Sequence, residues 1–206
     1  MGITIYYRGS IEDLSLIEPI QNEIMAYCQS MNWNYQLWNL NLSKPFNARL
    51  VHEPKGIKIQ GHIPLRGVSI FSDPKNEVLD VMFNPEGRLS SFMQEIMIHD
   101  GSLTWDQAWL FVKTQYGSVD AHIGIIKLLQ LLKQSYIPNL EVHDEGQYWE
   151  TANRERLMAL RGYIFGKMNQ LQKALSSIQF DHEPSEEEVL RKINSIIKKI
   201  MRKRPG

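Results

Sequence analysis

The amino-acid sequence predicts an α+β fold with a mixed sheet, in which a central antiparallel meander is flanked by two β-α-β units and followed by two C-terminal helices. Three observations predict this fold. Turn signals recur at regular intervals between residues 48 and 93, which is typical of an antiparallel meander. Strand-like and helix-like segments alternate on both sides of that region, in residues 3–40 and 109–143. Residues 151–200 carry apolar side chains at helical spacing.

The first β-α-β unit lies at the N-terminus. Residues 3–7 are mostly β-branched or aromatic and predict a strand. Ser15 precedes Glu18 by three residues, which is the spacing of a capping box, so we expect a helix from there to about Met31. The aromatic-rich run Tyr35-Gln36-Leu37-Trp38 predicts the second strand of this unit.

Three turns are expected to join the strands of the meander. Their sequences are Glu53-Pro54-Lys55-Gly56, Asp73-Pro74-Lys75-Asn76 and Asn84-Pro85-Glu86-Gly87. Pro has the φ angle that the second position of a type I turn needs, and Gly or Asn at the fourth position accepts the left-handed conformation that closes a hairpin loop. We therefore expect an antiparallel meander from about Ala48 to Met93.

The second β-α-β unit follows the meander. Residues 110–116 predict a strand, Ser118 is a suitable N-cap, and an apolar helix is expected from Val119 to about Tyr136. The segment Leu140-Glu141-Val142-His143 predicts the next strand. Its layout resembles that of the first unit, but the residues do not repeat, so the chain has no sequence repeat here.

Two helices are predicted after these units. The first extends from about residue 151 to residue 178, and Asp181-His182-Glu183-Pro184 ends it. Ser185 and Glu188 have the spacing of a second capping box, which predicts a last helix. The apolar residues at three- and four-residue spacing in the first helix are Leu157, Leu160, Ile164, Met168, Leu171, Leu175 and Ile178. We expect residues 1–150 to form an α+β core domain and residues 151–206 a helical segment that packs on it or forms an oligomer interface.

Composition and charge limit the classes of partner. The chain has 206 residues with 23 Lys and Arg against 23 Asp and Glu, so it lacks the strong basic field of a protein whose main task is to grip nucleic acid. A nucleic-acid contact is expected only through the basic C-terminal end, where Lys198, Lys199, Arg202, Lys203 and Arg204 occur. The helix dipole explains the same basic end through stability alone.

The sequence predicts a cytoplasmic protein with no transmembrane segment. Its one cysteine, Cys28, lies in an apolar-periodic stretch, so we expect it to be a small buried residue without a disulfide partner. The N-terminus has no basic region followed by an apolar core, and no run of roughly 18 apolar residues occurs without a charge.

Candidate site residues follow from the second β-α-β unit. In sheets with crossover helices, ligands bind beyond the carboxyl ends of strands, near helix N-termini. This rule selects as catalytic candidates the residues Lys113, His122, His143, Asp144 and Glu145. It selects as ligand-binding candidates the residues Gln115, Tyr148, Trp149, Glu150 and Arg154. General acid-base chemistry, or a hard metal held by carboxylates with histidine support, is the chemistry that these residue types indicate.

The alternative is that these residues are structural. A histidine on an apolar helix face is commonly a satisfied core residue, and an Asp-Glu-Gly after a strand is commonly a turn with solvated charges. The sequence contains no paired-Cys motif, no His-Glu-x-x-His, no phosphate-binding Gly-rich loop and no Gly-x-Ser-x-Gly. No metal-site motif is therefore present, and no cofactor is identified.

Two functions are consistent with these observations. The first is a domain that binds a small-molecule ligand or substrate through the polar strand-end residues. The second is a non-enzymatic interaction or regulatory protein that acts through its C-terminal helices, as a homo-oligomer or with another partner. The sequence leaves open whether the protein is an enzyme.

Overall fold

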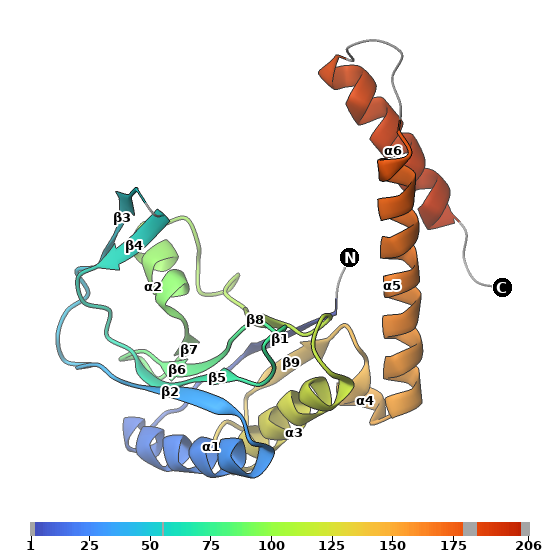
Figure 1. Ribbon diagram of the computed structural model, residues 1–206. Helices are drawn as coiled ribbons and strands as arrows, with labels where there is room; N and C mark the ends of the chain where they lie inside the picture. The colour runs from blue at the N-terminus through green and yellow to red at the C-terminus, as the bar shows by residue number, and fades with distance from the viewer. Residues whose placement is uncertain (1–2, 55, 179–184, 203–206) are drawn as a thin grey trace. The chain divides into compact units, whose positions relative to one another are not determined.

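The computed structural model describes residues 3–54, 56–178 and 185–202 and confirms the predicted α+β class (Figure 1). The chain divides into two compact units. One extends to Arg154, and the second begins at Glu155.

A three-stranded sheet has the N-terminal strand at its centre. Strand β1 (Thr4–Arg8) is antiparallel to both β8 (Leu110–Lys113) and β9 (Glu141–Asp144). Strands β8 and β9 are therefore parallel to each other, and helix α3 (Val119–Ser135) connects them. The helix starts at Ser118, whose side chain accepts a backbone hydrogen bond as a capping residue should. The second predicted β-α-β unit is thus present, with β1 inserted between its strands.

A four-stranded antiparallel sheet and a separate hairpin contain the predicted meander. The sheet has the order β2-β5-β6-β7, and the hairpin consists of β3 and β4. Their bounds are β2 Asn34–Asn39, β3 Arg49–Glu53, β4 Gly56–Gln60, β5 Arg66–Phe71, β6 Leu79–Phe83 and β7 Leu89–Ser90. The three predicted turn segments join β3 to β4, β5 to β6 and β6 to β7. The meander ends earlier than expected, because helix α2 (Phe92–His99) begins before Met93 with Ser91 as its N-cap.

The first strand–helix–strand segment differs from the prediction in its pairing and in its cap. Helix α1 (Ile17–Met31) ends where it was predicted to end, but β1 and β2 belong to different sheets. The Ser15–Glu18 capping box is absent, because Asp13 caps a short 3₁₀ turn (η1, Leu14–Leu16) and its carboxylate accepts hydrogen bonds from the Ser15 backbone N–H and hydroxyl. Asp13 therefore engages the hydroxyl that was expected to cap α1.

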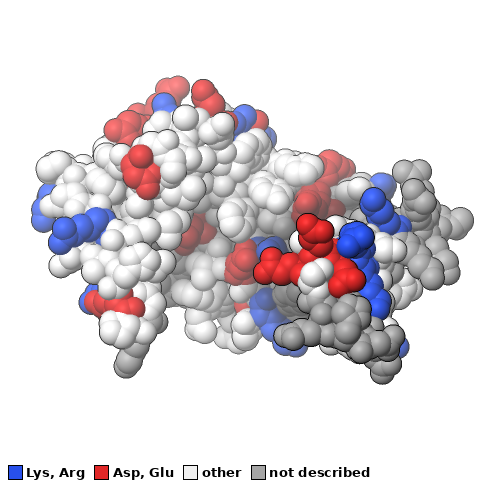
Figure 2. Space-filling model, turned by 90° about the horizontal axis from the view of Figure 1, so that it is seen from above, with Lys and Arg blue, Asp and Glu red and all other residues white. Residues whose placement is uncertain are grey.

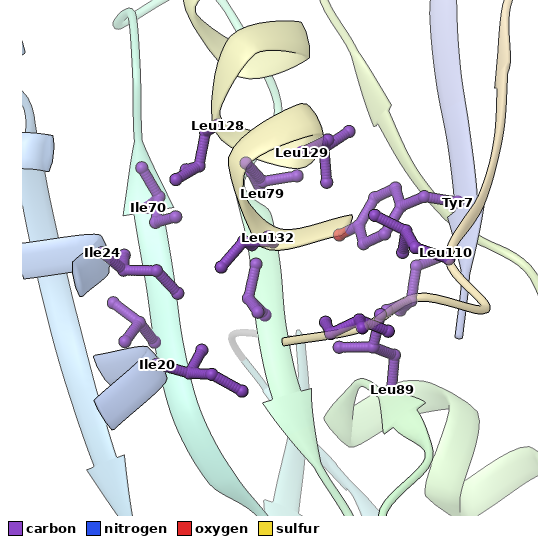
Figure 3. Packing of buried hydrophobic residues seen from close by; sticks show 14 of the residues in the cluster. Tyr7, Ile20, Ile24, Ile70, Leu79, Leu89, Leu110, Leu128, Leu129 and Leu132 are labelled. Carbon is purple, nitrogen blue, oxygen red and sulfur yellow. The ribbon is translucent and has the colours of Figure 1, made fainter. Parts of the chain in front are cut away.

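The main core lies between the sheets and two helices. In Figure 1, α1 and α3 lie on one side of the sheets, and α2 with the β3–β4 hairpin lies on the other. Figure 3 shows side chains of α1 and α3 converging on strands of the four-stranded sheet and on β1. Among the buried residues drawn there are Tyr7, Ile20, Ile24, Ile70, Leu79, Leu128, Leu129 and Leu132. Burial of these apolar side chains is the dominant favourable contribution to folding. Cys28 is fully buried in the same cluster, as predicted.

A smaller apolar cluster covers the opposite face of the four-stranded sheet. It contains Ile63, Leu65, Met82 and Ile96, with Trp38, Phe46, Ala48 and Phe92 packed against it. Because Ile96 and Phe92 belong to α2, this cluster attaches α2 to the sheet. Other residues of α2, Met93, Gln94 and Met97, line the candidate site.

The first of the two C-terminal helices begins slightly later than predicted, and the second begins where it was predicted to begin. A short helix, α4 (Tyr148–Thr151), ends at Ala152 in a left-handed conformation, and α5 (Arg154–Ser176) follows. Residues 181–184, predicted to break the helix, lie outside the described residues. Helix α6 (Glu186–Arg202) starts with the predicted capping box, in which the Ser185 N–H donates to the Glu188 carboxylate at 3.1 Å and the Glu188 N–H donates to Ser185 Oγ at 3.3 Å. Among the described helices, none is long and apolar enough to cross a membrane.

Candidate functional site

The structure brings two of the predicted catalytic residues, His122 and Asp144, into direct contact. Nε2 of His122 in α3 donates to Oδ2 of Asp144 at the end of β9 over 3.2 Å, and both side chains are completely buried. Nδ1 of His122 lies 2.7 Å from the hydroxyl of Thr114, which follows β8. The hydrogen bonds thus connect both strand ends of the second β-α-β unit to its helix.

Asp144 also binds the backbone of the turn that follows β9. Its carboxylate accepts hydrogen bonds from the N–H groups of Gly146 at 2.7 Å, Tyr148 at 2.7 Å and Trp149 at 3.1 Å. Burial raises the pKa of Asp144. The hydrogen bond and charge of His122, together with the backbone donors, lower the pKa by more than burial raises it, so the net pKa lies below its usual range. The carboxylate is therefore ionised and fully hydrogen-bonded near neutral pH.

This arrangement fits a structural role for the buried pair. With no exposed surface, His122 and Asp144 offer no face to a substrate, and the hydrogen bonds that they make connect α3, β8, β9 and α4. A buried polar network whose members are satisfied fixes the relative position of the elements that it joins. Catalysis by these two residues stays a prediction that no contact in the structure supports.

The other three catalytic candidates lie apart from this pair. His143 alternates with Asp144 on β9, is exposed, and stacks on Tyr6 of β1 with ring centroids 6.1 Å apart. The Glu145 carboxylate accepts the Thr4 backbone N–H at 2.9 Å. Nζ of Lys113 lies 3.9 Å from the Glu77 carboxylate. Each of these groups already contacts a neighbour, and the five residues do not form one cluster.

The ligand-binding candidates are also dispersed. Tyr148 and Trp149 are partly buried against the main core, and Gln115 is buried after β8. Glu150 is exposed, and Arg154 forms an ion pair with Asp120 near the start of α3. The aromatic pair therefore anchors α4 to the core.

A different part of the molecule contains a hollow suited to a ligand. It has a volume of about 430 Å³ and lies between α2, the loop that leads to β8, and the neighbouring edges of β6 and β8. We call it the α2–β8 hollow. It is lined by Tyr7, Glu77, Val78, Asp80, Ser91, Met93, Gln94, Met97, Leu103, Gln107, Trp109, Leu110 and Phe111. Its volume falls within the range of small-molecule sites, about 300–1,000 Å³.

Apolar side chains dominate the walls of the α2–β8 hollow. Met93 and Met97 are four residues apart on α2 and so share one face of that helix. Two of the apolar lining residues, Phe111 on β8 and Val78 before β6, are 54% and 37% exposed to solvent. Flexible Met side chains adapt to ligands of different shapes.

Asp80 supplies a charged group in this apolar wall. Its Oδ1 accepts a hydrogen bond from Ser69 Oγ at 2.5 Å, and Ser69 Oγ accepts one from Trp38 Nε1 at 3.0 Å. The Tyr7 hydroxyl donates to the Asp80 carbonyl at 2.7 Å and accepts its N–H at 3.1 Å, which closes the backbone edge of β6. Burial raises the pKa of the Asp80 carboxyl, and the Ser69 hydrogen bond offsets part of that rise.

A second, more polar hollow of about 310 Å³ is lined by residues that include Arg8, Arg88, Trp105 and Glu141. The Arg8 guanidinium makes two hydrogen bonds to the Glu141 carboxylate, at 2.9 and 3.0 Å. Arg88 lies over the Trp105 ring, 5.0 Å from its centroid. The contact with Glu141 already compensates one of the two arginines.

The described part of the chain holds no candidate metal centre, and one face of the molecule is mixed in charge. There, no group of three or more His, Cys, Asp and Glu side chains is placed to hold a metal ion. On the face shown in Figure 2, acidic and basic side chains lie among uncharged ones, and neither sign covers the face. Comparison of the chain with protein-family models, curated proteins and solved structures finds no match.

Sequence reasoning missed the α2–β8 hollow, although two signals for it are present. Asp80 is the only charged residue in the strand Leu79-Asp80-Val81-Met82-Phe83, and a carboxylate within an apolar strand is a candidate functional group. Met93 and Met97 have helical spacing, and they occur where the predicted meander ends. Recognising α2 would have placed both methionines on one surface.

Proposed function

We propose that residues up to Arg154 form a domain that binds a small amphipathic molecule in the α2–β8 hollow. The observation that carries this proposal is the combination of an apolar hollow of about 430 Å³ with a partly buried, hydrogen-bonded carboxyl, that of Asp80, in its wall. Ligand sites of proteins typically combine mostly apolar walls with a few placed polar groups.

Backbone groups add to the polar part of the proposed site. Thr114 N–H donates to Ile3 C=O, and hydrogen bonds alternate along an antiparallel ladder, so the N–H and C=O of Phe111 point away from β1. They lie on the edge of β8 where the Lys113 N–H already donates to Glu77. A ligand in the hollow therefore meets apolar side chains, a carboxyl and an open strand edge.

An uncharged apolar fluorophore, N-phenyl-1-naphthylamine, tests the proposal. Its emission increases when it leaves water for an apolar site, so we expect saturable binding by the purified chain. Met93→Trp places a larger side chain at the mouth of the hollow and should weaken binding about tenfold, which corresponds to about 1.4 kcal/mol. Equal binding by this variant and the wild type contradicts the proposed location.

Met158→Trp is the matched control for this experiment. Met158 lies on α5, outside the hollow, and is 52% exposed, whereas Met93 is 47% exposed. Both changes add the same surface apolar area to a helix. Loss of binding in both variants would therefore indicate non-specific adsorption of the fluorophore and would refute the α2–β8 hollow as its site.

Interaction through the C-terminal helices is a second candidate function. Leu190 and Ile197 on α6 are 58% and 39% exposed, although they follow the apolar spacing of that helix. Light scattering at high protein concentration tests a homo-oligomer, since a monomer contradicts it. The basic end that was predicted to contact nucleic acid lies mostly outside the residues whose side chains are described, so that partner stays a prediction.

A further inference from the structure

We propose that the ligand of the α2–β8 hollow is an organic cation, in which an ammonium group is attached to an apolar body and contacts Asp80. This inference rests on the proposed function, because it names the class of ligand that the same hollow binds. It follows from the charges of the lining residues, from the position of Asp80 and from the apolar residues that line the hollow with it.

The charged residues that line the hollow have one sign. Asp80 and Glu77 are acidic, and no Lys, Arg or His belongs to the lining within the described residues. Two cations lie nearby. Nζ of Lys113 lies 3.9 Å from Glu77 and partly compensates it, and Arg8, which lies over the Trp109 ring, makes two hydrogen bonds to Glu141. Asp80 forms no ion pair within the described residues, so an anionic ligand would be repelled by its carboxylate, whereas a cation is attracted by it.

Asp80 is held so that it presents one oxygen to a ligand. Oδ1 accepts the hydrogen bond from Ser69, and the described residues provide no hydrogen bond to Oδ2. Asp80 and Ser69 are also paired across β5 and β6, so the sheet fixes the orientation of the carboxyl before a ligand arrives. A preorganised acceptor with one free oxygen suits a donor that carries positive charge.

The low polarity of the surroundings strengthens this preference. Burial raises the pKa of Asp80, which means that its negative charge is poorly solvated in the unliganded protein. A bound ammonium group replaces the missing solvation and stabilises the charge. Trp109, Leu110 and Phe111 line the same hollow and provide apolar surface for the body of the ligand.

Size limits the ligand to a small molecule. A hollow of about 430 Å³ holds an aryl ring with a short alkylamine chain but not a folded partner. The outer edge of β8 is also short, because Glu77 already pairs with Lys113 there through the 3.0 Å hydrogen bond from its N–H to the Lys113 carbonyl. Too little free edge remains for a peptide to add a strand.

Three probes of the same shape and different charge test the inference. They are 4-phenylbutylamine, which is a cation at pH 7, 4-phenylbutanol, which is neutral, and 4-phenylbutyrate, which is an anion. Each is titrated by calorimetry into the wild-type chain and into Asp80→Asn, and each competes with N-phenyl-1-naphthylamine. We expect the wild type to bind the amine about tenfold more tightly than the alcohol, since a charge-assisted hydrogen bond is worth roughly that factor or more.

The variant separates recognition of charge from the hollow itself. Asn is isosteric with Asp and keeps an oxygen that accepts the Ser69 hydrogen bond, so the fold is expected to persist, which circular dichroism checks. In Asp80→Asn the advantage of the amine should fall to about twofold or less, while the alcohol keeps its affinity. Glu77→Gln, at the rim, should reduce the advantage by a smaller factor, because Glu77 is near Lys113.

The outcomes distinguish the two proposals. Equal binding of all three probes, with normal binding of the fluorophore, overturns the cationic ligand and leaves the hollow as a binding site. Tighter binding of the butyrate overturns it as well. Failure of all three probes and of the fluorophore overturns both proposals. An amine preference that persists unchanged in Asp80→Asn refutes the role of Asp80.

Discussion

Replacing Asp144 with alanine is expected to destabilise the core domain strongly. The carboxylate accepts four hydrogen bonds, from the Gly146, Tyr148 and Trp149 backbone N–H groups and from His122 Nε2. Asp144→Ala removes all four acceptors and leaves His122 buried without its partner. Removing one member of a buried hydrogen-bonded charge pair costs about 3–5 kcal/mol.

We expect a value at the lower end, about 3 kcal/mol, because the N–H groups of Tyr148 and Trp149 are only part-buried and water can reach them after the change. For a chain of this size, 1 kcal/mol corresponds to about 2–4 °C in Tm, so the expected loss is about 6–12 °C. Urea unfolding followed by circular dichroism and tryptophan fluorescence measures the free energy directly.

His143→Ala is the control, since His143 is the neighbouring residue on β9 but is exposed and contacts only the Tyr6 ring among the contacts described. It should cost less than about 1 kcal/mol. A cost below about 1 kcal/mol for Asp144→Ala, or equal costs for the two variants, would refute the structural role of the buried pair.

The same pair predicts an acid dependence of stability. The net pKa of folded Asp144 lies below its unfolded value of about 3.9, so its stabilisation is present above that pH and is lost as the pH falls through the folded pKa. The difference in unfolding free energy between the wild type and Asp144→Ala should therefore shrink between about pH 5 and pH 2. A difference that stays constant over this range contradicts the assigned cause.

Three further predictions concern other parts of the fold. Burial raises the pKa of folded Asp80, so the contribution of its carboxyl to stability is greatest at low pH and is lost as the pH rises through the folded pKa. Asp80→Asn should therefore be at least as stable as the wild type at pH 7, and a lower urea midpoint for the variant contradicts this. Gly67→Ala should lower the free energy of unfolding by about 3 kcal/mol or more in the same assay, because the new Cβ would lie 2.1 Å from the Val81 carbonyl oxygen. Gly162→Ala, whose Cβ would meet no described atom within 4 Å beyond the adjacent turns of α5, should raise it by about 0.5–1 kcal/mol. Similar effects of the two changes would disprove the close approach of β5 and β6. Cys28, whose pKa burial raises to about 11, should not react with a thiol reagent at pH 8 until the chain unfolds, and rapid labelling of the native protein would show that it is accessible.

Local signals in the sequence predicted local structure well. The turns at 73–76 and 84–87, the Ser118 cap and the Ser185–Glu188 capping box depend on residues within a few positions of each other, and the structure contains all of them. The Ser15–Glu18 prediction was wrong because Asp13, a stronger local acceptor, engages the Ser15 hydroxyl and N–H.

Pairing between distant strands could not be predicted in the same way. Strand β1 pairs with β8 and β9, more than 100 residues along the chain, and not in a unit with β2. Such pairing depends on which apolar faces the whole fold buries, and no short pattern near β1 encodes it. The division of the strands into separate sheets therefore required the structure.

The candidate site shows the same division between local and distant information. The rule of strand ends correctly placed His122 near Asp144, since both follow from one β-α-β unit. It did not indicate that both would be fully buried, because burial depends on α4 and the turn after β9. The α2–β8 hollow combines residues from β1, β6, α2 and β8, which lie far apart in the sequence.

The most direct test of the proposed ligand site is a titration of isotope-labelled protein with 4-phenylbutylamine, observed through the indole N–H signals in a nitrogen–proton correlation spectrum. Trp109 lines the α2–β8 hollow, whereas Trp33 and Trp149 pack against the main core. Saturable movement of the Trp109 signal, with Trp33 and Trp149 unchanged, is the predicted result. A spectrum in which the Trp109 signal does not move, or in which the core tryptophans move instead, would contradict ligand binding in this hollow.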